Sequence, residues 1–303
     1  RILAFSIVMA VLILLSLAAV SYTLFTVLED KRIALIGSLA AMFTIYVIPL
    51  LANAGGSYYL QYQPHRILMP ALLVAFCTFY AKSRNKSVLY VLGFVFSAFA
   101  LLWNIDTGVV VVVSWTAFQL YRSAYERNLN DRSFYLETGR AILSGGAAIL
   151  LAGVVLLVIT YARTGEVVDI MKSLASQTLF YKYGYYMLPT PLLHPWILLV
   201  LVYGISLAKS IRNLKVLRAD EAEYGSLLSS LYFLLPVIGM GIFSYYNGRS
   251  HELVFLAIVW PGVVLLALFC QEYLRRLKKD GWRGVNLLKF VLALWLLSVF
   301  AAG

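Results

Sequence analysis

The chain alternates between long hydrophobic stretches and short polar loops. Ten such stretches lie at 2–28, 33–54, 67–81, 88–104, 107–121, 141–162, 195–209, 226–246, 253–271 and 286–303. The longest of them exceed the roughly 20 residues that a helix needs to cross a hydrocarbon core of about 30 Å. A helix satisfies its own backbone hydrogen bonds in lipid, whereas an open sheet does not. The pattern predicts an all-α polytopic membrane helix bundle with about ten transmembrane segments, and residues 1–303 form a single transmembrane helical domain.

Composition strengthens this prediction. Hydrophobic residues make up 62% of the 303 residues and charged residues 13%, with a mean hydropathy of +0.83. A soluble domain is closer to half apolar and a quarter charged. The net charge of +11 does not indicate nucleic-acid binding, because the basic residues lie at the ends of the apolar stretches. Anionic membrane lipid accounts for them there.

Charge divides the loops into two sets. When the loops are assigned alternately to two sides, 19 of the 25 Lys and Arg residues fall on one side, including the clusters at 82–86 and 275–283. Cytoplasmic loops carry the excess of basic residues in membrane proteins. The pattern therefore places these loops in the cytoplasm, and the other set outside, in a multi-pass membrane protein. The first stretch then starts outside, so a natural chain with a cytoplasmic N-terminus would need an odd number of helices before Arg1. We therefore expect a fragment that lacks N-terminal helices.

One outer loop, 163–194, is long enough to hold structure of its own. Apolar residues recur at mostly helical spacing over 166–180, and Thr164 is placed to cap a helix there. We expect an interfacial helix lying along the membrane surface. The tyrosines at 181–186 are typical of an interfacial belt, or alternatively form a wall that stacks on sugar or lipid.

The predicted outer side holds all three histidines: His65, His194 and His251. It also holds Asp106, in the very short turn Trp103-Asn104-Ile105-Asp106-Thr107-Gly108 between two apolar stretches. One interpretation of this turn is a helix cap made by Asp106 or Asn104. The other is a functional carboxylate, a candidate catalytic base or a metal- or sugar-binding group, since charges near apolar depth are usually placed for use.

A second polar turn, 245–252, carries the candidate substrate-binding residues Tyr246, Asn247, Arg249, Ser250 and His251. The planar fork of an arginine suits a phosphate, and histidine can donate or accept a proton near neutral pH. The pair His65-Arg66 repeats this chemistry on another loop and joins the candidates. His194 precedes Pro195-Trp196, which favours an interfacial anchor. Alternatively, the second turn is a solvated loop with a snorkelling arginine.

Metal and cofactor signals are weak. The outer acids do not form a DxD motif, and Glu166 and Asp169 share only a possible helix face. No glycine-rich nucleotide loop is apparent. No metal site and no certain cofactor are therefore predicted, although a divalent metal stays possible.

The multispan layout and the two turns, at 103–108 and 246–251, resemble bacterial integral-membrane glycosyltransferases of the GT-C superfamily. The resemblance implies transfer of a sugar from a polyprenyl-phosphate carrier to a saccharide or lipid acceptor. The same resemblance implies that the reaction takes place at the outer face of a bacterial inner (plasma) membrane. It also implies that Arg249, with His251, holds the carrier phosphate. The superfamily's catalytic carboxylate usually lies in the first outer loop. If helices precede Arg1 in the natural protein, that catalytic carboxylate lies upstream of Arg1. Asp106 would then be a supporting or acceptor-side carboxylate, or a substitute base.

Two other functions fit the same features. One is an O-antigen-ligase-like or polymerase-like enzyme, which would use a larger outer loop than 163–194. The other is a transporter or flippase for a lipid-linked saccharide. Transport predicts polar groups in mid-membrane and, commonly, internal repeats. The nearly charge-free centres of the apolar stretches and the absence of an evident repeat count against it.

Overall fold

The structure is a computed structural model that describes residues 2–48, 64–126, 132–175, 182, 188–216, 223–248, 250, 252–280 and 284–302. These residues are almost entirely helical and contain no β-strand. The helices are α1 (Ile2–Val27), α2 (Lys31–Met42), the π-helix η1 (Phe43–Val47), α4 (Leu68–Lys82), α5 (Lys86–Trp103), α6 (Ile105–Glu126), α7 (Arg132–Thr164), α8 (Ile170–Ala175), α10 (Trp196–Val216), α11 (Glu223–Gly248), α12 (Glu252–Ile258), α13 (Trp260–Asp280) and α14 (Gly284–Ala302). The predicted all-α class is confirmed.

Each of the ten predicted stretches is helical where it is described, but two of them are interrupted. The stretch 33–54 is α2 followed by η1, and the stretch 253–271 is α12 followed by α13. The second break lies at Val259, two residues before Pro261. Pro261 has no N–H to continue the hydrogen-bond ladder of α12, and it fits the first turn of the new helix. The backbone resumes at once, since the N–H of Gly262 donates to the carbonyl of Val259 at 2.9 Å.

Within the described part of the chain, five helices are long and apolar enough to cross a membrane: Leu3–Val27, Lys86–Trp103, Arg132–Thr164, Trp196–Leu214 and Gly225–Asn247. The apolar helices Leu68–Lys82 and Asn286–Leu297 are shorter. The count of ten membrane crossings is therefore not confirmed. The membrane character of the chain is confirmed, because large apolar side chains cover helix surfaces that face no other helix. On α7, for example, Leu143 is 76% exposed and Leu150 is 72% exposed, as expected for contact with lipid.

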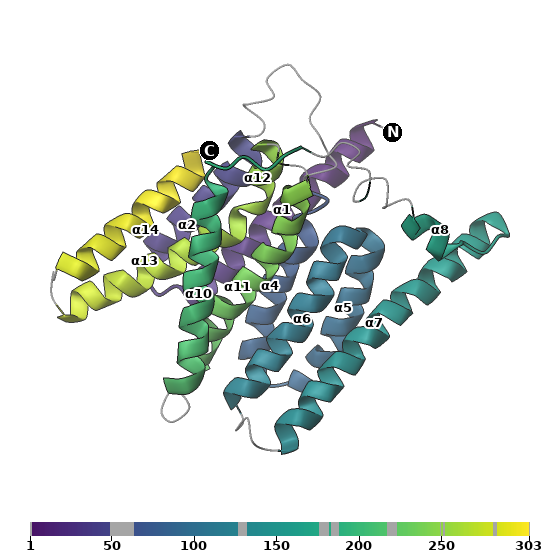
Figure 1. The fold of residues 1–303 in the computed structure, drawn as a ribbon, viewed down its shortest axis with the longest axis horizontal. Coiled ribbons are helices and arrows are strands. Elements are labelled where there is room, and N and C mark those ends of the chain that lie inside the picture. The colour runs from purple at the N-terminus through teal and green to yellow at the C-terminus, as the bar shows by residue number, and fades with distance from the viewer. Residues whose placement is uncertain are drawn as a thin grey trace.

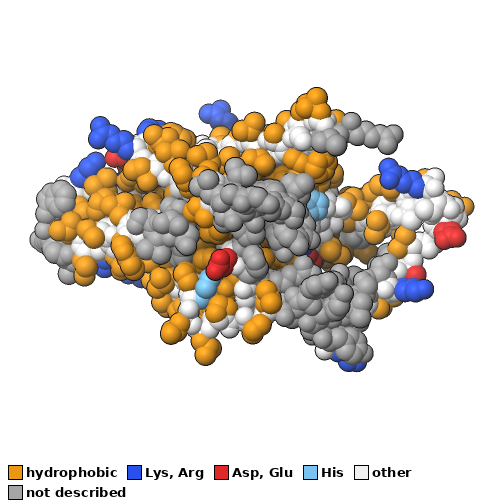
Figure 2. Space-filling model, turned by 90° about the horizontal axis from the view of Figure 1, so that it is seen from above, with side chains coloured by type: hydrophobic (Ala, Val, Ile, Leu, Met, Phe, Trp, Pro, Cys, Tyr) orange, Lys and Arg blue, Asp and Glu red, His pale blue; other side chains and the backbone are white. Residues whose placement is uncertain are grey.

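The helix ends gather at two opposite ends of the bundle (Figure 1). One, called the Asp106 end here, holds the α5–α6 turn, the last residues of α7 and the first of α10, and the α11–α12 turn. The other, called the basic end, holds the ends of α4 and α5 at 82–86 and of α6 and α7 at 126–132. Figure 2 looks onto the Asp106 end, where apolar side chains surround a few scattered charged ones and histidine. The described ends of α4 to α7 thus place the basic cluster at 82–86 and the turn with Asp106 at opposite ends of the bundle.

The core of the bundle is centred on α11 and α13. All eight side chains from Val263 to Cys270 are buried, and the large buried rings of Tyr203, Tyr232 and Trp260 pack around them. α11 also packs against α6. This contact sets α11 beside the α5–α6 turn that carries Asp106.

The predicted interfacial helix is not confirmed. The structure has only the six-residue α8 within 166–180, and residues 176–181 and 183–187 lie outside the described residues. Thr164 is also not the cap: it is the last residue of α7, and Asp169 accepts the N–H of Lys172 at 2.9 Å instead. Gly165, with φ of 72°, ends α7 because glycine takes this left-handed conformation without strain.

Candidate functional site

The turn between α5 and α6 is built by Asn104. Its backbone is extended, with φ −159° and ψ 117°, and its Oδ1 accepts hydrogen bonds from Thr107 N at 3.1 Å and Thr107 Oγ1 at 3.2 Å. These bonds satisfy an N-terminal donor of α6 that would otherwise have no partner. Asn104 is therefore the cap, and Asp106, in the first turn of α6, keeps its carboxylate for other contacts.

Gly108 permits the close approach of α6 to α5. A Cβ atom at this position would lie 2.5 Å from the carbonyl oxygen of Ala100 and from the Cα of Leu101. Backbone atoms cannot move aside as a flexible side chain can, so only glycine fits here. The short turn and the tight crossing together hold Asp106 at the end of the bundle.

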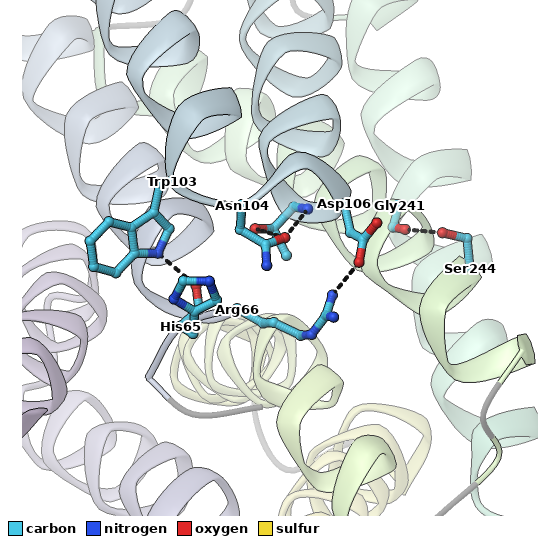
Figure 3. A network of polar contacts seen from close by, with 8 residues as sticks. His65, Arg66, Trp103, Asn104, Asp106, Gly241 and Ser244 are labelled. Carbon is cyan, nitrogen blue, oxygen red and sulfur yellow. Dashed lines mark hydrogen bonds and ion pairs between the residues drawn. The ribbon is translucent and has the colours of Figure 1, made fainter. Parts of the chain in front are cut away.

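Asp106 forms an ion pair with Arg66 (Figure 3). Arg66 Nη1 donates to Asp106 Oδ2 at 2.7 Å, and the two side chains are 17% and 37% exposed. Arg66 lies in the turn 64–67 that leads into α4, so the pair joins segments 40 residues apart. The guanidinium carbon of Arg66 also lies 3.8 Å from the ring centre of Tyr245 on α11, close enough for a cation–π interaction.

His65, the residue before Arg66, contacts Trp103 at the end of α5. Its backbone carbonyl accepts the indole N–H of Trp103 at 2.9 Å, and the two rings lie 5.1 Å apart (Figure 3). Burial, and then the neighbouring Arg66 charge, lower the pKa of His65 below its ordinary value. The imidazole is therefore neutral at neutral pH and can accept or donate a hydrogen bond.

The ion pair borders a cavity of about 260 Å³ between α6, α11 and α12. The cavity is mostly apolar and its polar groups are gathered at the ion pair. The lining residues are Arg66, Ile105, Asp106, Thr107, Val109, Gly241, Ile242, Ser244, Tyr245, Val254, Ala257 and Ile258. A mainly apolar cavity with a few convergent polar groups is typical of a small-molecule site.

Tyr246 lies in the interior of the bundle instead of lining this cavity. Its side chain is fully buried, its hydroxyl lies 3.3 Å from His194 Nδ1, and its ring packs against Phe255 at 5.5 Å. His194 itself packs edge-on against Phe255 at 4.8 Å. Burial lowers the pKa of His194, and the smaller effect of the Glu252 charge raises it. Tyr246 and His194 thus connect the segment before α10 to the end of α11.

The α11–α12 turn is tied to the same segment. Thr190 Oγ1 donates to Asn247 Oδ1 at 3.1 Å, and Ser250 Oγ donates to Thr190 Oγ1 at 3.0 Å. Ser250 Oγ also reaches the Tyr246 carbonyl at 3.1 Å. The strongest candidates from the sequence, Arg249 and His251, lie outside the described residues.

The structure thus brings Arg66 and Asp106 into direct contact, with His65 next to them. Tyr245 and Ser244, which line the cavity, were not predicted. Their position beside Tyr246 in the sequence was the available signal. Among the described residues, no group of three His, Cys, Asp or Glu side chains could hold a metal ion.

Comparison of the chain with protein-family models, with curated proteins and with solved structures finds no match, so the GT-C resemblance rests on the residues alone.

Proposed function

We propose that this protein is a membrane glycosyltransferase that moves a sugar from a polyprenyl-phosphate carrier to a saccharide or lipid acceptor. The observation that carries the proposal is the Arg66–Asp106 ion pair at the border of an otherwise apolar cavity. A polyprenyl-linked sugar has the matching parts: an apolar chain, an anionic phosphate and a polar sugar. The resemblance of the turns at 103–108 and 246–251 points to the same reaction.

In the proposed reaction, the phosphate of the carrier competes with Asp106 for the guanidinium of Arg66. A bidentate arginine–phosphate contact is among the stronger charge-assisted hydrogen bonds. Asp106, once released, accepts the proton of the acceptor hydroxyl. The acceptor oxygen then bonds to the anomeric carbon while the bond from that carbon to the phosphate oxygen breaks. Arg66 stabilises the charge that develops on the leaving phosphate.

Arg249 and His251 have a place in this proposal as further phosphate-binding groups. Ser250, between them in the chain, is held by Thr190 and by the Tyr246 carbonyl. Asn247 is held by Thr190 as well. These bonds hold Asn247 and Ser250, the described neighbours of Arg249 and His251, and the buried Tyr246 anchors the same end of α11.

The proposal includes ten membrane crossings, with the Asp106 end outside a bacterial plasma membrane and 163–194 at the membrane interface. Two features support it. Helices α4, α5, α6 and α7 run alternately between the two ends of the bundle (Figure 1), and Lys82, Arg84, Lys86 and Arg132 lie at the basic end. The short helix α4 packs against α1, α5, α6 and α11 and is buried over most of its length, so that few of its side chains face lipid.

Transfer assays with purified protein in proteoliposomes test the proposal. The donors are radiolabelled hexosyl and pentosyl polyprenyl monophosphates, and the acceptors are soluble saccharides and a membrane lipid extract. Asp106→Asn keeps the shape but removes the base, so we expect transfer to fall about 100-fold or more. Arg249→Ala is expected to abolish transfer without unfolding the protein.

Glu166→Gln is the matched control, because it removes an exposed carboxylate at the same end of the bundle and leaves the cavity intact. It should transfer sugar as the unaltered protein does. Full activity of Asp106→Asn would exclude the proposed base. Movement of the label across the bilayer with its carrier bond intact would identify a transporter instead.

A further inference from the structure

A second cavity lies at the basic end of the bundle, far along α6 from Asp106. Its volume is about 250 Å³ and it is lined mainly by polar side chains. It opens between α4, α5, α6 and α7. The lining residues are Tyr80, Lys86, Ser87, Tyr90, Gln119, Arg122, Ser123, Glu126, Glu137, Arg140 and Ala141. Nothing in the proposed transfer reaction uses these groups.

Arg122 is the central group of this cavity. Its side chain is only 8% exposed, and its Nη2 donates to Glu126 one turn later on α6. Its other terminal nitrogen, Nη1, is buried without a hydrogen-bond partner among the described residues, and so is the hydroxyl oxygen of Ser123. A buried donor with no partner costs free energy, and the cost is larger for a charged group. Both residues line the cavity, so a small rotation of either side chain would let a bound group satisfy its donor.

Among the described residues that line the cavity, the charges around Arg122 are not balanced. Glu126 is shared, because Lys86 Nζ also lies 3.8 Å from its Oε1. Arg140 reaches Glu137 only at 3.9 Å, and its guanidinium carbon lies 4.7 Å from the ring centre of Tyr90. Three cations thus face two carboxylates across one cavity, and the excess positive charge favours an anion over water alone.

We propose that this cavity binds a phosphate group. Arginine forks match the geometry of phosphate oxygens, and Arg122 and Arg140 approach the cavity from different helices. The outer surface of α7 beside it is apolar, with Leu136 64% exposed and Leu143 76% exposed. An acyl chain can therefore lie along α7 while the phosphate enters the cavity, and a free phosphate ion meets the same donors. The proposal does not depend on the proposed transferase activity.

Binding to the purified full chain in detergent, at constant ionic strength, tests the proposal. The lipid probe is dihexanoyl phosphatidic acid, measured by native mass spectrometry. The free-ion probe is radiolabelled inorganic phosphate, measured by equilibrium dialysis. We expect saturable binding of one or both, and about tenfold weaker binding in Arg122→Gln and in Arg140→Gln, since each removes one charge-assisted contact.

Arg132→Gln is the control, because Arg132 is an exposed cation at the same end of the bundle, on α7. Its binding should be unchanged. Arg140 is 58% exposed, so Arg140→Gln keeps the test decisive if Arg122→Gln does not fold. Binding of lipid but not of free phosphate assigns a headgroup site, and binding of free phosphate assigns an ion site. The proposal is overturned if neither probe binds, or if Arg132→Gln weakens binding as much as Arg140→Gln does.

Discussion

At the scale of single residues, the candidate site depends on which side chain does which task in the α5–α6 turn. The sequence left the cap to either Asn104 or Asp106. The structure assigns it to Asn104, because its Oδ1 accepts two hydrogen bonds from Thr107. Asp106 is then free to pair with Arg66, which lies 40 residues away in the chain. No local pattern could have predicted that partner.

Gly108 offers a test of this turn at residue scale. Gly108→Ala places a methyl group 2.5 Å from backbone atoms of α5, so the helices must separate, at a cost of about 1–3 kcal/mol. We expect a lower melting temperature of the purified protein. Gly139→Ala, on α7 with nothing within 4 Å of its Cβ position, should keep or slightly raise the melting temperature, because alanine favours helix. Equal behaviour of the two variants would rule out the tight crossing.

At the scale of elements, α7 shows how a long apolar helix packs by a narrow stripe. Its buried residues are Ala141, Gly145, Ala148 and Ala152, all small and three or four positions apart. Most of its large apolar residues are exposed, as Leu143 and Leu150 are. Small residues let two helices approach closely in a membrane, where lipid tails are as apolar as leucine. The periodicity of large apolar residues therefore does not identify the packed face.

Packing along this stripe predicts different effects on stability for substitutions at two nearby positions of α7. Ala148 is 3% exposed, so Ala148→Leu forces α7 away from its neighbours and should destabilise the protein by about 1–3 kcal/mol. Leu150→Ala removes a side chain that is 72% exposed and should change stability little. Thermal unfolding in detergent measures both. A larger loss for Leu150→Ala would show that the other face of α7 is packed.

At the scale of the whole molecule, the two ends of the bundle carry two different cavities. The basic end carries the cavity around Arg122, and the Asp106 end carries the cavity beside Arg66. Each cavity combines arginine with a carboxylate, but their linings differ. The cavity around Arg122 is lined mainly by polar groups, and the cavity beside Arg66 is mainly apolar around its ion pair.

The predicted orientation is testable by labelling single cysteines in intact cells with a membrane-impermeant maleimide. Cys77 and Cys270 are both buried, so the background should be low. Glu166→Cys, at the Asp106 end, should react from outside the cell. Arg84→Cys, in the exposed turn between α4 and α5, should react only after the membrane is permeabilised. The reverse pattern would place the proposed transfer site in the cytoplasm.

The sequence by itself determined the helical class, the positions of the apolar helices and their membrane character, because these depend on the length and hydropathy of contiguous stretches. It also located the polar turns at the Asp106 end. Only the tertiary structure decided which distant side chains meet, as Arg66 and Asp106 do, and which are buried, as Tyr246 is. It also decided where the stretch 253–271 breaks, at Val259. These features depend on packing between segments far apart in the chain, which no local pattern specifies.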